Sequence, residues 1–106
     1  MQDNLKKGTT RKQMPVATGV LAYFPLAIKY ISRVSLAGNE QHHPGTPLHY
    51  DKNKSQDHLD AATRHMIDHL QGEILDTDGI LHLGKYGWRG LAILQKFLEE
   101  NPNYLN

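Results

Sequence analysis

The strongest constraint on the fold is an apolar stripe between residues 80 and 98, whose spacing is that of an α-helix. Its members recur every three or four residues, as one face of an amphipathic helix requires: Ile80, Leu83, Gly87, Leu91, Leu94 and Leu98. Cationic and imidazole side chains lie on the opposite side, and Asn101-Pro102 ends the segment. The stripe therefore predicts one long helix near the end of the chain.

Three glycines, Gly84, Gly87 and Gly90, interrupt this predicted helix. Each glycine costs about 1 kcal/mol relative to alanine in a helix interior. A close approach of another helix or of a ligand is the usual offsetting gain, so we expect such an approach here. Trp88 lies at the edge of the stripe and has two interpretations. It is either a residue of the core or of a subunit interface, or a platform on which a base stacks.

Two further helices are predicted upstream. Pro25 suits a first helical turn, so one helix is expected over about residues 25–37, with Gly38 as the residue that ends it. The other is expected over about residues 56–71 or beyond, with Ser55 as its N-cap. The segment between them is a loop by composition and is rich in groups that bind ligands. The predicted fold class is all-α, with a long ligand-binding loop.

The chain length limits the core that these helices can form. The chain has 106 residues, enough for one domain with a modest core. Residues 1–14 are expected to form a flexible basic arm, and residues 15–106 the domain. Three short helices and a long loop make a thin core, so we expect a small bundle completed by a homodimer or homotetramer.

Composition excludes several classes of function. The chain has no cysteine, which rules out a disulfide framework, a thiol nucleophile and a thiolate-ligated zinc site. Its formal net charge of +1 gives no general argument for nucleic acid or membrane as a partner. No signal peptide is evident, and we expect a cytoplasmic protein. Neither the zincin His-Glu-x-x-His motif nor a P-loop is present.

Residues 64–79 hold the densest group of imidazoles and carboxylates. A second helix that continued through Gly72 would place four of them on one face: His65, His69, Glu73 and Asp76. Imidazoles and carboxylates that converge in this way are typical ligands of a divalent cation. The alternative is a solvated polar face that ends in a turn.

The carboxylates and the cationic residues that follow them suggest phosphoryl chemistry. Glu40, Glu73 and Asp76 can hold Mg²⁺ or Mn²⁺, which prefer oxygen ligands. Lys85 and Arg89 follow on the next helix and are suited to phosphate. Carboxylates, metal and cations together are the requirements for phosphoryl transfer. The alternative for the cationic residues is again a solvated face.

Four sequence segments together resemble a known family: Gly38-Asn39-Glu40-Gln41-His42, Arg64-His65, Gly72-Glu73-x-x-Asp76-x-Asp78-Gly79-x-x-His82-Leu83 and Trp88-Arg89. The family is the phage and bacterial dATP/dGTP diphosphohydrolases, which are related to the all-α MazG-type nucleotide pyrophosphohydrolases. The resemblance extends over about residues 15–99. MazG-type enzymes carry Glu-x-x-Glu and later Glu-x-x-Asp, of which this chain keeps only Glu73-x-x-Asp76. His43 stands three residues after Glu40, where a second carboxylate would be needed.

The resemblance implies a Mg²⁺- or Mn²⁺-dependent enzyme that cuts a purine (deoxy)nucleoside triphosphate between its α- and β-phosphates. The expected substrate is dGTP above all, or dATP, and the products are the monophosphate and pyrophosphate. For some phages the resemblance further implies a supply of dGMP for genomes that contain 2-aminoadenine. The location would then be the host cytoplasm.

On this hypothesis the metal ligands are Glu40, Glu73 and Asp76. Water attacks the α-phosphorus and loses its proton to one of these carboxylates or to His69. The remaining predicted roles are phosphate contacts from Lys54, Lys85 and Arg89, and a base or sugar pocket that includes Asn39 and His43.

Two other functions remain open from the sequence. One is a non-catalytic helical module that binds nucleic acid or a partner protein through the basic arm and the cationic face of the last helix. The low net charge and the neighbouring acidic residues argue against nucleic acid. The other is a metal-dependent phosphatase that acts on a different class of nucleotide and releases phosphate.

Overall fold

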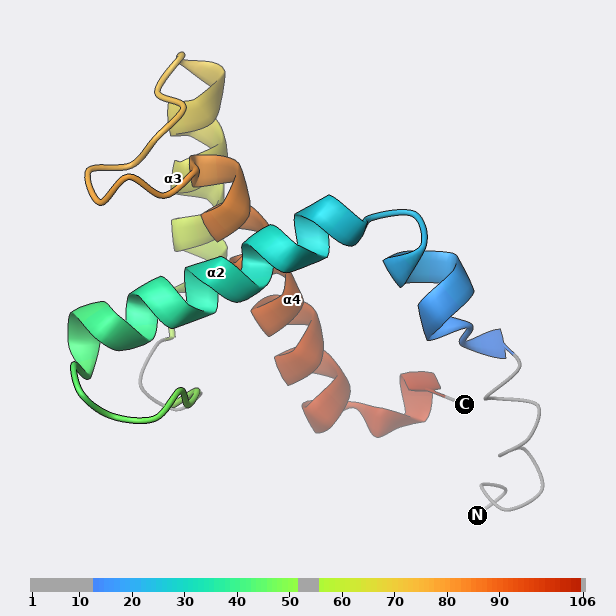
Figure 1. Cartoon of the computed structure of the whole chain (residues 1–106). Coiled ribbons are helices and arrows are strands. Elements are labelled where there is room, and N and C mark those ends of the chain that lie inside the picture. The colour runs from blue at the N-terminus through green and yellow to red at the C-terminus, as the bar shows by residue number, and fades with distance from the viewer. Residues whose placement is uncertain (1–12, 52–55, 106) are drawn as a thin grey trace.

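The computed structural model describes residues 13–51 and 56–105, and within these ranges the chain is helical (Figure 1). Its elements are the short turn η1 (Ala17–Leu21), the helices α2 (Pro25–His42), α3 (His58–Leu70) and α4 (His82–Glu100), and the short turn η2 (Pro102–Leu105). The β-type pairing among the described residues is one isolated antiparallel bridge between Leu75 and Leu81. The predicted all-α fold class is confirmed. Completion by a second copy remains a prediction.

Helix α4 is the element on which the other two helices pack (Figure 1). Its glycines explain how closely α2 can cross it. A Cβ atom on Gly84 would lie 2.6 Å from ring carbons of Tyr30, and one on Gly87 would lie 3.0 Å from Ile31. Among the described residues, no atom lies within 4 Å of the corresponding point on Gly90. The expected close helix approach is therefore confirmed at two of the three glycines and is wrong at Gly90.

Tyr30 also fixes the start of α4 through its hydroxyl group. The backbone N–H of Leu81, the residue just before the helix, donates a hydrogen bond to Tyr30 Oη at 2.9 Å. This N–H has no partner within the helix, because the first N–H groups of any helix lack one. Tyr30 therefore joins α2 to the entrance of α4 over 51 residues of sequence.

Replacement of this hydroxyl group is expected to have a small and measurable effect on stability. Tyr30→Phe keeps the ring on Gly84 but leaves the Leu81 N–H without its acceptor, which should lower the free energy of unfolding by about 1 kcal/mol. Urea denaturation followed by circular dichroism measures the change. An unchanged midpoint would show that solvent satisfies this N–H equally well.

The predicted end of the first long helix is wrong, and the second does not continue beyond about residue 71. Helix α2 continues through Gly38 to His42, because Gly38 keeps a helical backbone while Gly45, with φ of 80°, makes the following turn. Asn39 therefore lies on a helix and not in the loop. Helix α3 ends at Leu70, and Gly72 adopts a φ of 96° that a helix does not allow.

The beginning of α3 also differs from the prediction. Its N-cap residue is Asp57, and the helix starts at His58. Ser55, the predicted N-cap, lies outside the described residues. The predicted basic arm, residues 1–14, lies almost wholly outside them as well.

The apolar core of the described residues is thin. Its buried apolar members are Ala61, Ala62, Ile80 and Ala92, and none of the described large side chains is fully buried. Leu91 and Leu94, which belong to the predicted buried stripe, are 51% and 55% exposed. The radius of gyration is 16.2 Å, against about 13 Å for a compact domain of this size. The stripe is therefore helical as predicted but largely uncovered within one chain.

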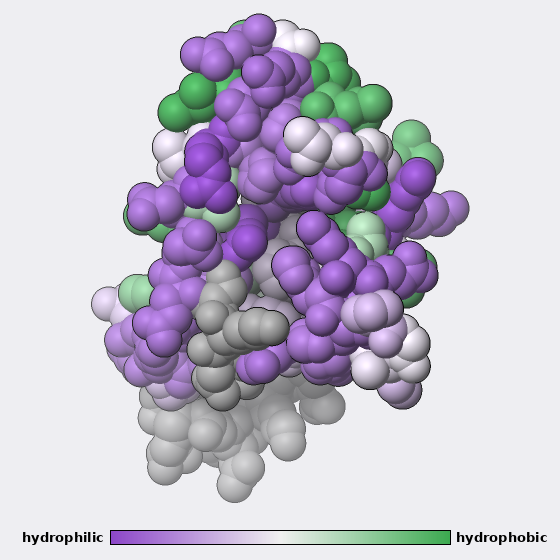
Figure 2. Space-filling model, turned by 90° about the vertical axis from the view of Figure 1, so that its left-hand side faces the viewer, coloured by the Kyte–Doolittle hydropathy of each residue, from purple (hydrophilic) through white to green (hydrophobic). Residues whose placement is uncertain are grey.

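Two faces of the molecule differ in character. An apolar groove of about 710 Å³ lies between α2 and α4, with Ile31, Leu91 and Leu94 among its lining residues. The face formed by the end of α2, by α3 and by the 71–81 segment is mostly hydrophilic and is hollowed near its centre (Figure 2). None of the described helices is both long and apolar enough to cross a membrane.

Candidate functional site

The segment between α3 and α4 turns back on itself and brings distant side chains together. Asp76 donates its backbone N–H to the carbonyl of Ile80 at 2.8 Å, and His82 donates to the carbonyl of Ile74 at 3.1 Å. Asp78 accepts the N–H of Ile80 at 3.0 Å, and Gly79 supplies the left-handed backbone that the turn needs, with φ of 80°. The Asp-Thr-Asp-Gly sequence therefore places Asp76 beside the first residue of α4.

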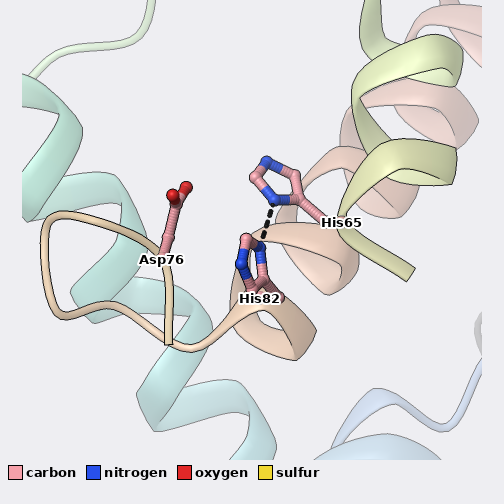
Figure 3. Close-up of side chains that lie close together, drawn as sticks. All are labelled: His65, Asp76 and His82. Atoms are coloured by element: carbon pink, nitrogen blue, oxygen red, sulfur yellow. Dashed lines mark hydrogen bonds between the residues drawn. The ribbon is translucent and has the colours of Figure 1, made fainter. Parts of the chain in front are cut away.

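His65, Asp76 and His82 meet at this point (Figure 3). One donor atom from each residue lies within 4.8 Å of the other two. The Nδ1 atoms of His65, on α3, and His82, on α4, are 2.9 Å apart. One of these nitrogens must carry a proton and the other a lone pair, because a hydrogen bond needs one donor and one acceptor. His65 is half-buried, and His82 is only 3% exposed.

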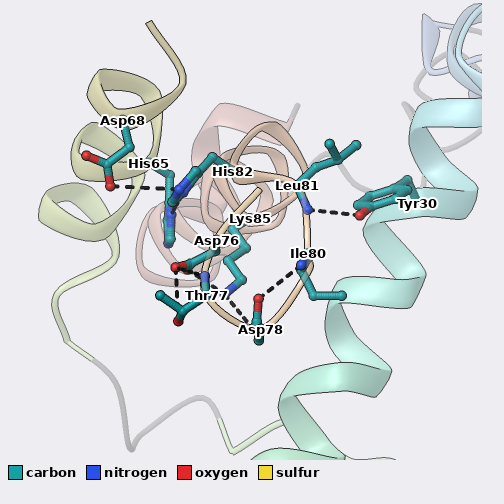
Figure 4. A network of polar contacts seen from close by, with 10 residues as sticks. All are labelled: Tyr30, His65, Asp68, Asp76, Thr77, Asp78, Ile80, Leu81, His82 and Lys85. Carbon is teal, nitrogen blue, oxygen red and sulfur yellow. Dashed lines mark hydrogen bonds and ion pairs between the residues drawn. The ribbon is translucent and has the colours of Figure 1, made fainter. Parts of the chain in front are cut away.

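A second group of possible ligands shares His82. It consists of His82, Asp68 and Glu73, again with donor atoms within 4.8 Å of one another. The Nε2 atom of His82 lies 4.0 Å from Asp68 Oδ2 (Figure 4). The two ring nitrogens of His82 therefore face different partners, His65 on one side and Asp68 on the other.

Lys85 binds both carboxylates of the turn (Figure 4). Its Nζ atom lies 2.7 Å from Asp76 Oδ2 and 2.7 Å from Asp78 Oδ2. The hydrogen bond from Lys85 and the backbone N–H of Thr77 outweigh burial and lower the pKa of Asp76 to about 2. Burial would raise the pKa of Asp78, but its bonds to Lys85 and to the Ile80 N–H lower it overall. Both carboxylates are thus charged at neutral pH in surroundings that already hold a cation.

The imidazole of His65 is favoured in its neutral form. Burial lowers the pKa of His65 below its ordinary 6.5, and the charge of Asp76 opposes this only in part. A neutral imidazole keeps a nitrogen lone pair, which a metal ligand requires. The cluster of His65, Asp76 and His82 can therefore offer a metal ion nitrogen as well as oxygen ligands near neutral pH.

Aromatic and cationic side chains gather beside this group. The ring of Trp88 lies edge-on to Tyr50 at 5.1 Å and tilted to His58 at 6.0 Å. Arg89 Nη1 donates to His58 Nδ1 at 2.8 Å, and its guanidinium lies 5.8 Å from the Trp88 ring. Burial, followed by the charge of Arg89, lowers the pKa of His58. His58 thus acts as a buried neutral acceptor that holds Arg89 in place.

One cleft of about 460 Å³ connects these parts. Its lining includes carboxylates and a histidine, cationic side chains and aromatic rings, for example Asp76, His65, Lys85, Arg64, Tyr50 and Trp88. A triphosphate needs cations, a base needs flat apolar surfaces, and a divalent ion needs carboxylates or imidazoles. The cleft provides all three within one domain.

A comparison of the sequence with models of protein families shows the family to which the chain belongs. A family model described as dATP/dGTP diphosphohydrolase, N-terminal, matches residues 3–103. The chain belongs to this family. The resemblance stated from the sequence is thereby confirmed, and the family name indicates a hydrolase of the diphosphohydrolase class. No curated protein and no solved structure gave a significant match.

Several of the residues predicted from the sequence line the cleft of this diphosphohydrolase family member: Asn39, His43, Asp76, Lys85 and Arg89. Asn39 is buried, and its amide donates to the carbonyl of Thr46 at 3.1 Å. Its Oδ1 atom finds no hydrogen-bond partner among the described residues. The substrate contacts predicted for four of these residues, and the metal binding predicted for Asp76, stay predictions.

Three other predicted residues are not among those that line the cleft. Glu40 is exposed on α2, and Glu73 is exposed but belongs to the second group with Asp68 and His82. His69 is half-buried on α3, and its Nδ1 atom has no hydrogen-bond partner among the described residues. Lys54 lies outside the described residues. The metal and catalytic roles of Glu40, Glu73 and His69 stay predictions.

The sequence predicts His65 as one of four possible ligands of a divalent cation but assigns His82 no role at the site. His82 was placed on the solvent side of α4 by its helical period. As the first residue of that helix, it instead lies against α3. The signal that could have found it is the Asp78-Gly79 turn, because a tight reversal returns the chain to the end of the preceding helix.

Proposed function

We propose that this chain hydrolyses a purine deoxynucleoside triphosphate, dGTP or dATP, to the monophosphate and pyrophosphate. The observation that supports this most is one cleft lined by His65 and Asp76 together with cationic and aromatic side chains, with His82 bonded to His65. Family membership supports the reaction class.

The residues present fit a divalent cation, as the family relationship implies. Asp76 is ionised, and two imidazole nitrogens lie beside it. Bound there, Mg²⁺ or Mn²⁺ would neutralise phosphate charge and favour ionisation of a nearby water. Asp76 is the predicted carboxylate that the geometry favours most as a ligand. Glu73, which belongs to the neighbouring group, and the exposed Glu40 remain proposed ligands as well.

The cationic side chains have distinct parts in this proposal. Lys85 contacts the phosphates and balances the charge of Asp76 and Asp78, to both of which it is bound. Arg89 is fixed by His58 and reaches the same cleft from the aromatic side. The exposed Arg64 adds a third positive charge at the lining. These three charges suit the negative charge of a triphosphate.

The aromatic side of the cleft is the proposed site for the base. Trp88 is half-buried, and its ring lines the cleft beside Tyr50, where a base could contact both rings. Stacking on aromatic rings contributes about 1–3 kcal/mol per base in nucleic-acid complexes. The free Oδ1 acceptor of Asn39 supports its predicted role near the base or sugar.

A second copy of the chain is the proposed cover of the apolar groove between α2 and α4. The groove shares Ser35, Tyr50 and Trp88 with the cleft, so a copy seated there would lie next to the substrate. We propose a homodimer or homotetramer that works in the cytoplasm. In a phage-infected cell its product dGMP would supply 2-aminoadenine nucleotide synthesis.

Product analysis tests the proposed reaction directly. Incubated with Mn²⁺ and each dNTP in turn, the protein is expected to release pyrophosphate from dGTP or dATP, and none in excess EDTA. Chromatography of the nucleotide and an assay specific for pyrophosphate measure both products. Release of phosphate would instead indicate a phosphatase, and no product from any nucleotide would support a binding module.

A further inference from the structure

The donor atoms of the imidazole–carboxylate group carry an inference about the identity of the cation. We propose that His65, Asp76 and His82 form a nitrogen-ligated site that selects a transition-metal ion such as Mn²⁺, Co²⁺ or Zn²⁺ over Mg²⁺. The inference rests on the proposed function for its place in the reaction, and its test does not need turnover. It also differs from the three-carboxylate site expected from the sequence.

The spacing of the two imidazoles fits one shared ion. Two nitrogens bound at about 2.0–2.1 Å to the same ion lie about 2.8–3.4 Å apart for octahedral or tetrahedral angles. The Nδ1 atoms of His65 and His82 are 2.9 Å apart. In the metal-free state this distance is a hydrogen bond. To bind one ion, the ring that donates must carry its proton on Nε2 instead of Nδ1, and both rings must rotate so that their Nδ1 lone pairs converge. Asp76 completes the group from the turn, within 4.8 Å (Figure 3).

The surroundings of His82 indicate which of its nitrogens binds the ion. Histidine ligands commonly present their second nitrogen to a carboxylate, which orients the ring. Asp68 lies on the Nε2 side of His82 at 4.0 Å, opposite to the side that faces His65 (Figure 4). Asp68 is therefore a positioning residue for a single ion at Nδ1.

The ligand type determines the selectivity. Imidazole nitrogen is a good ligand for Zn²⁺, Co²⁺ and other borderline ions, whereas Mg²⁺ prefers oxygen ligands and keeps its water shell. Two of the three donors here are imidazoles. Lys85 adds a further condition, because its Nζ already holds Asp76 at 2.7 Å and competes with any cation at that carboxylate.

Co²⁺ is the probe for this site, because its visible absorption reports nitrogen ligation and its binding can be titrated calorimetrically. The full chain is expected to bind one Co²⁺, and a tenfold excess of Mg²⁺ should not displace it. His65→Ala should weaken binding by at least about tenfold, in line with the loss of one ligand. The matched control is His42→Ala, which removes an exposed histidine of α2 that belongs to neither ligand group.

The Lys85→Met variant tests metal ligation separately from protein stability. If His65 were important only for the fold, this substitution would not be expected to raise the affinity for Co²⁺. Removal of the competing ammonium should tighten Co²⁺ binding. Circular dichroism shows whether each variant keeps its helices. Unchanged Co²⁺ affinity in a folded His65→Ala protein, or displacement by equimolar Mg²⁺, would overturn the inference.

The two proposals fail in different ways. Pyrophosphate release that survives His65→Ala together with unchanged Co²⁺ binding would contradict the nitrogen-ligated site and leave the proposed function in place. Selective Co²⁺ binding without hydrolysis of any nucleotide would support the site and contradict the proposed function.

Discussion

Asp76→Asn is expected to reduce pyrophosphate release from dGTP by about 10²–10³-fold, the range seen when one preorganised electrostatic contact of an active site is lost. The substitution keeps the size of the side chain but removes the charge that faces His65, His82 and Lys85. Steady-state rates at saturating dGTP and Mn²⁺ measure the loss. The expected change is in kcat, with the helical circular dichroism signal retained.

Asp78→Asn is the matched control for this prediction. Asp78 lies two residues along the same turn and binds the same Lys85 Nζ at the same distance of 2.7 Å, but it is not in the histidine group. Its Oδ1 atom accepts the Ile80 N–H, which an asparagine oxygen can still do. We expect Asp78→Asn to keep most of the activity. Equal losses in both variants would show that only the net charge of the turn matters.

Gly84→Ala should destabilise the protein by about 2 kcal/mol, although alanine is the better helix former by about 1 kcal/mol. The added Cβ would lie 2.6 Å from two ring carbons of Tyr30 and 3.1 Å from Val34. The ring cannot move aside freely, because the Tyr30 hydroxyl accepts the Leu81 N–H. Either α2 shifts away from α4 or this hydrogen bond breaks. Urea denaturation measures the free energy of unfolding.

Gly90→Ala is the control with the opposite expected sign. It lies in the same helix, and no atom of the described residues lies within 4 Å of an added Cβ. Only the helix propensity changes, so the free energy of unfolding should rise by up to about 1 kcal/mol. Stabilisation by both substitutions would mean that Tyr30 does not press on Gly84 in solution.

Helix type could be predicted from the sequence because periodicity is a local property. The apolar stripe from Ile80 to Leu98 predicts α4, and the glycines at 84 and 87 predict its close contact with another helix, which is α2. Helix ends were less certain. Glycine ends a helix only where its backbone turns left-handed, as at Gly72, whereas Gly38 stays helical. The residue type alone does not distinguish the two cases.

The candidate site was only partly predictable for a related reason. Asp76, Lys85 and Arg89 could be proposed from their chemistry, and all three line the cleft. The pairing of His65 with His82 depends on a reversal of the chain over 17 residues, which helical spacing does not encode. The exposure of Leu91 and Leu94 in the single chain is likewise not encoded in helical spacing, which does not say whether a second chain covers the apolar stripe.

The central claim is that one cleft holds a divalent ion beside the triphosphate of a purine nucleotide. A crystal structure of the protein with Mn²⁺ and a dGTP analogue, in which the α–β bridging oxygen is replaced by a methylene group, tests this most directly. The account predicts an anomalous Mn²⁺ peak in contact with Asp76 and the His65–His82 pair, with phosphate oxygens beside Lys85. An ion and nucleotide bound elsewhere, with these side chains still bonded only to one another, would contradict it.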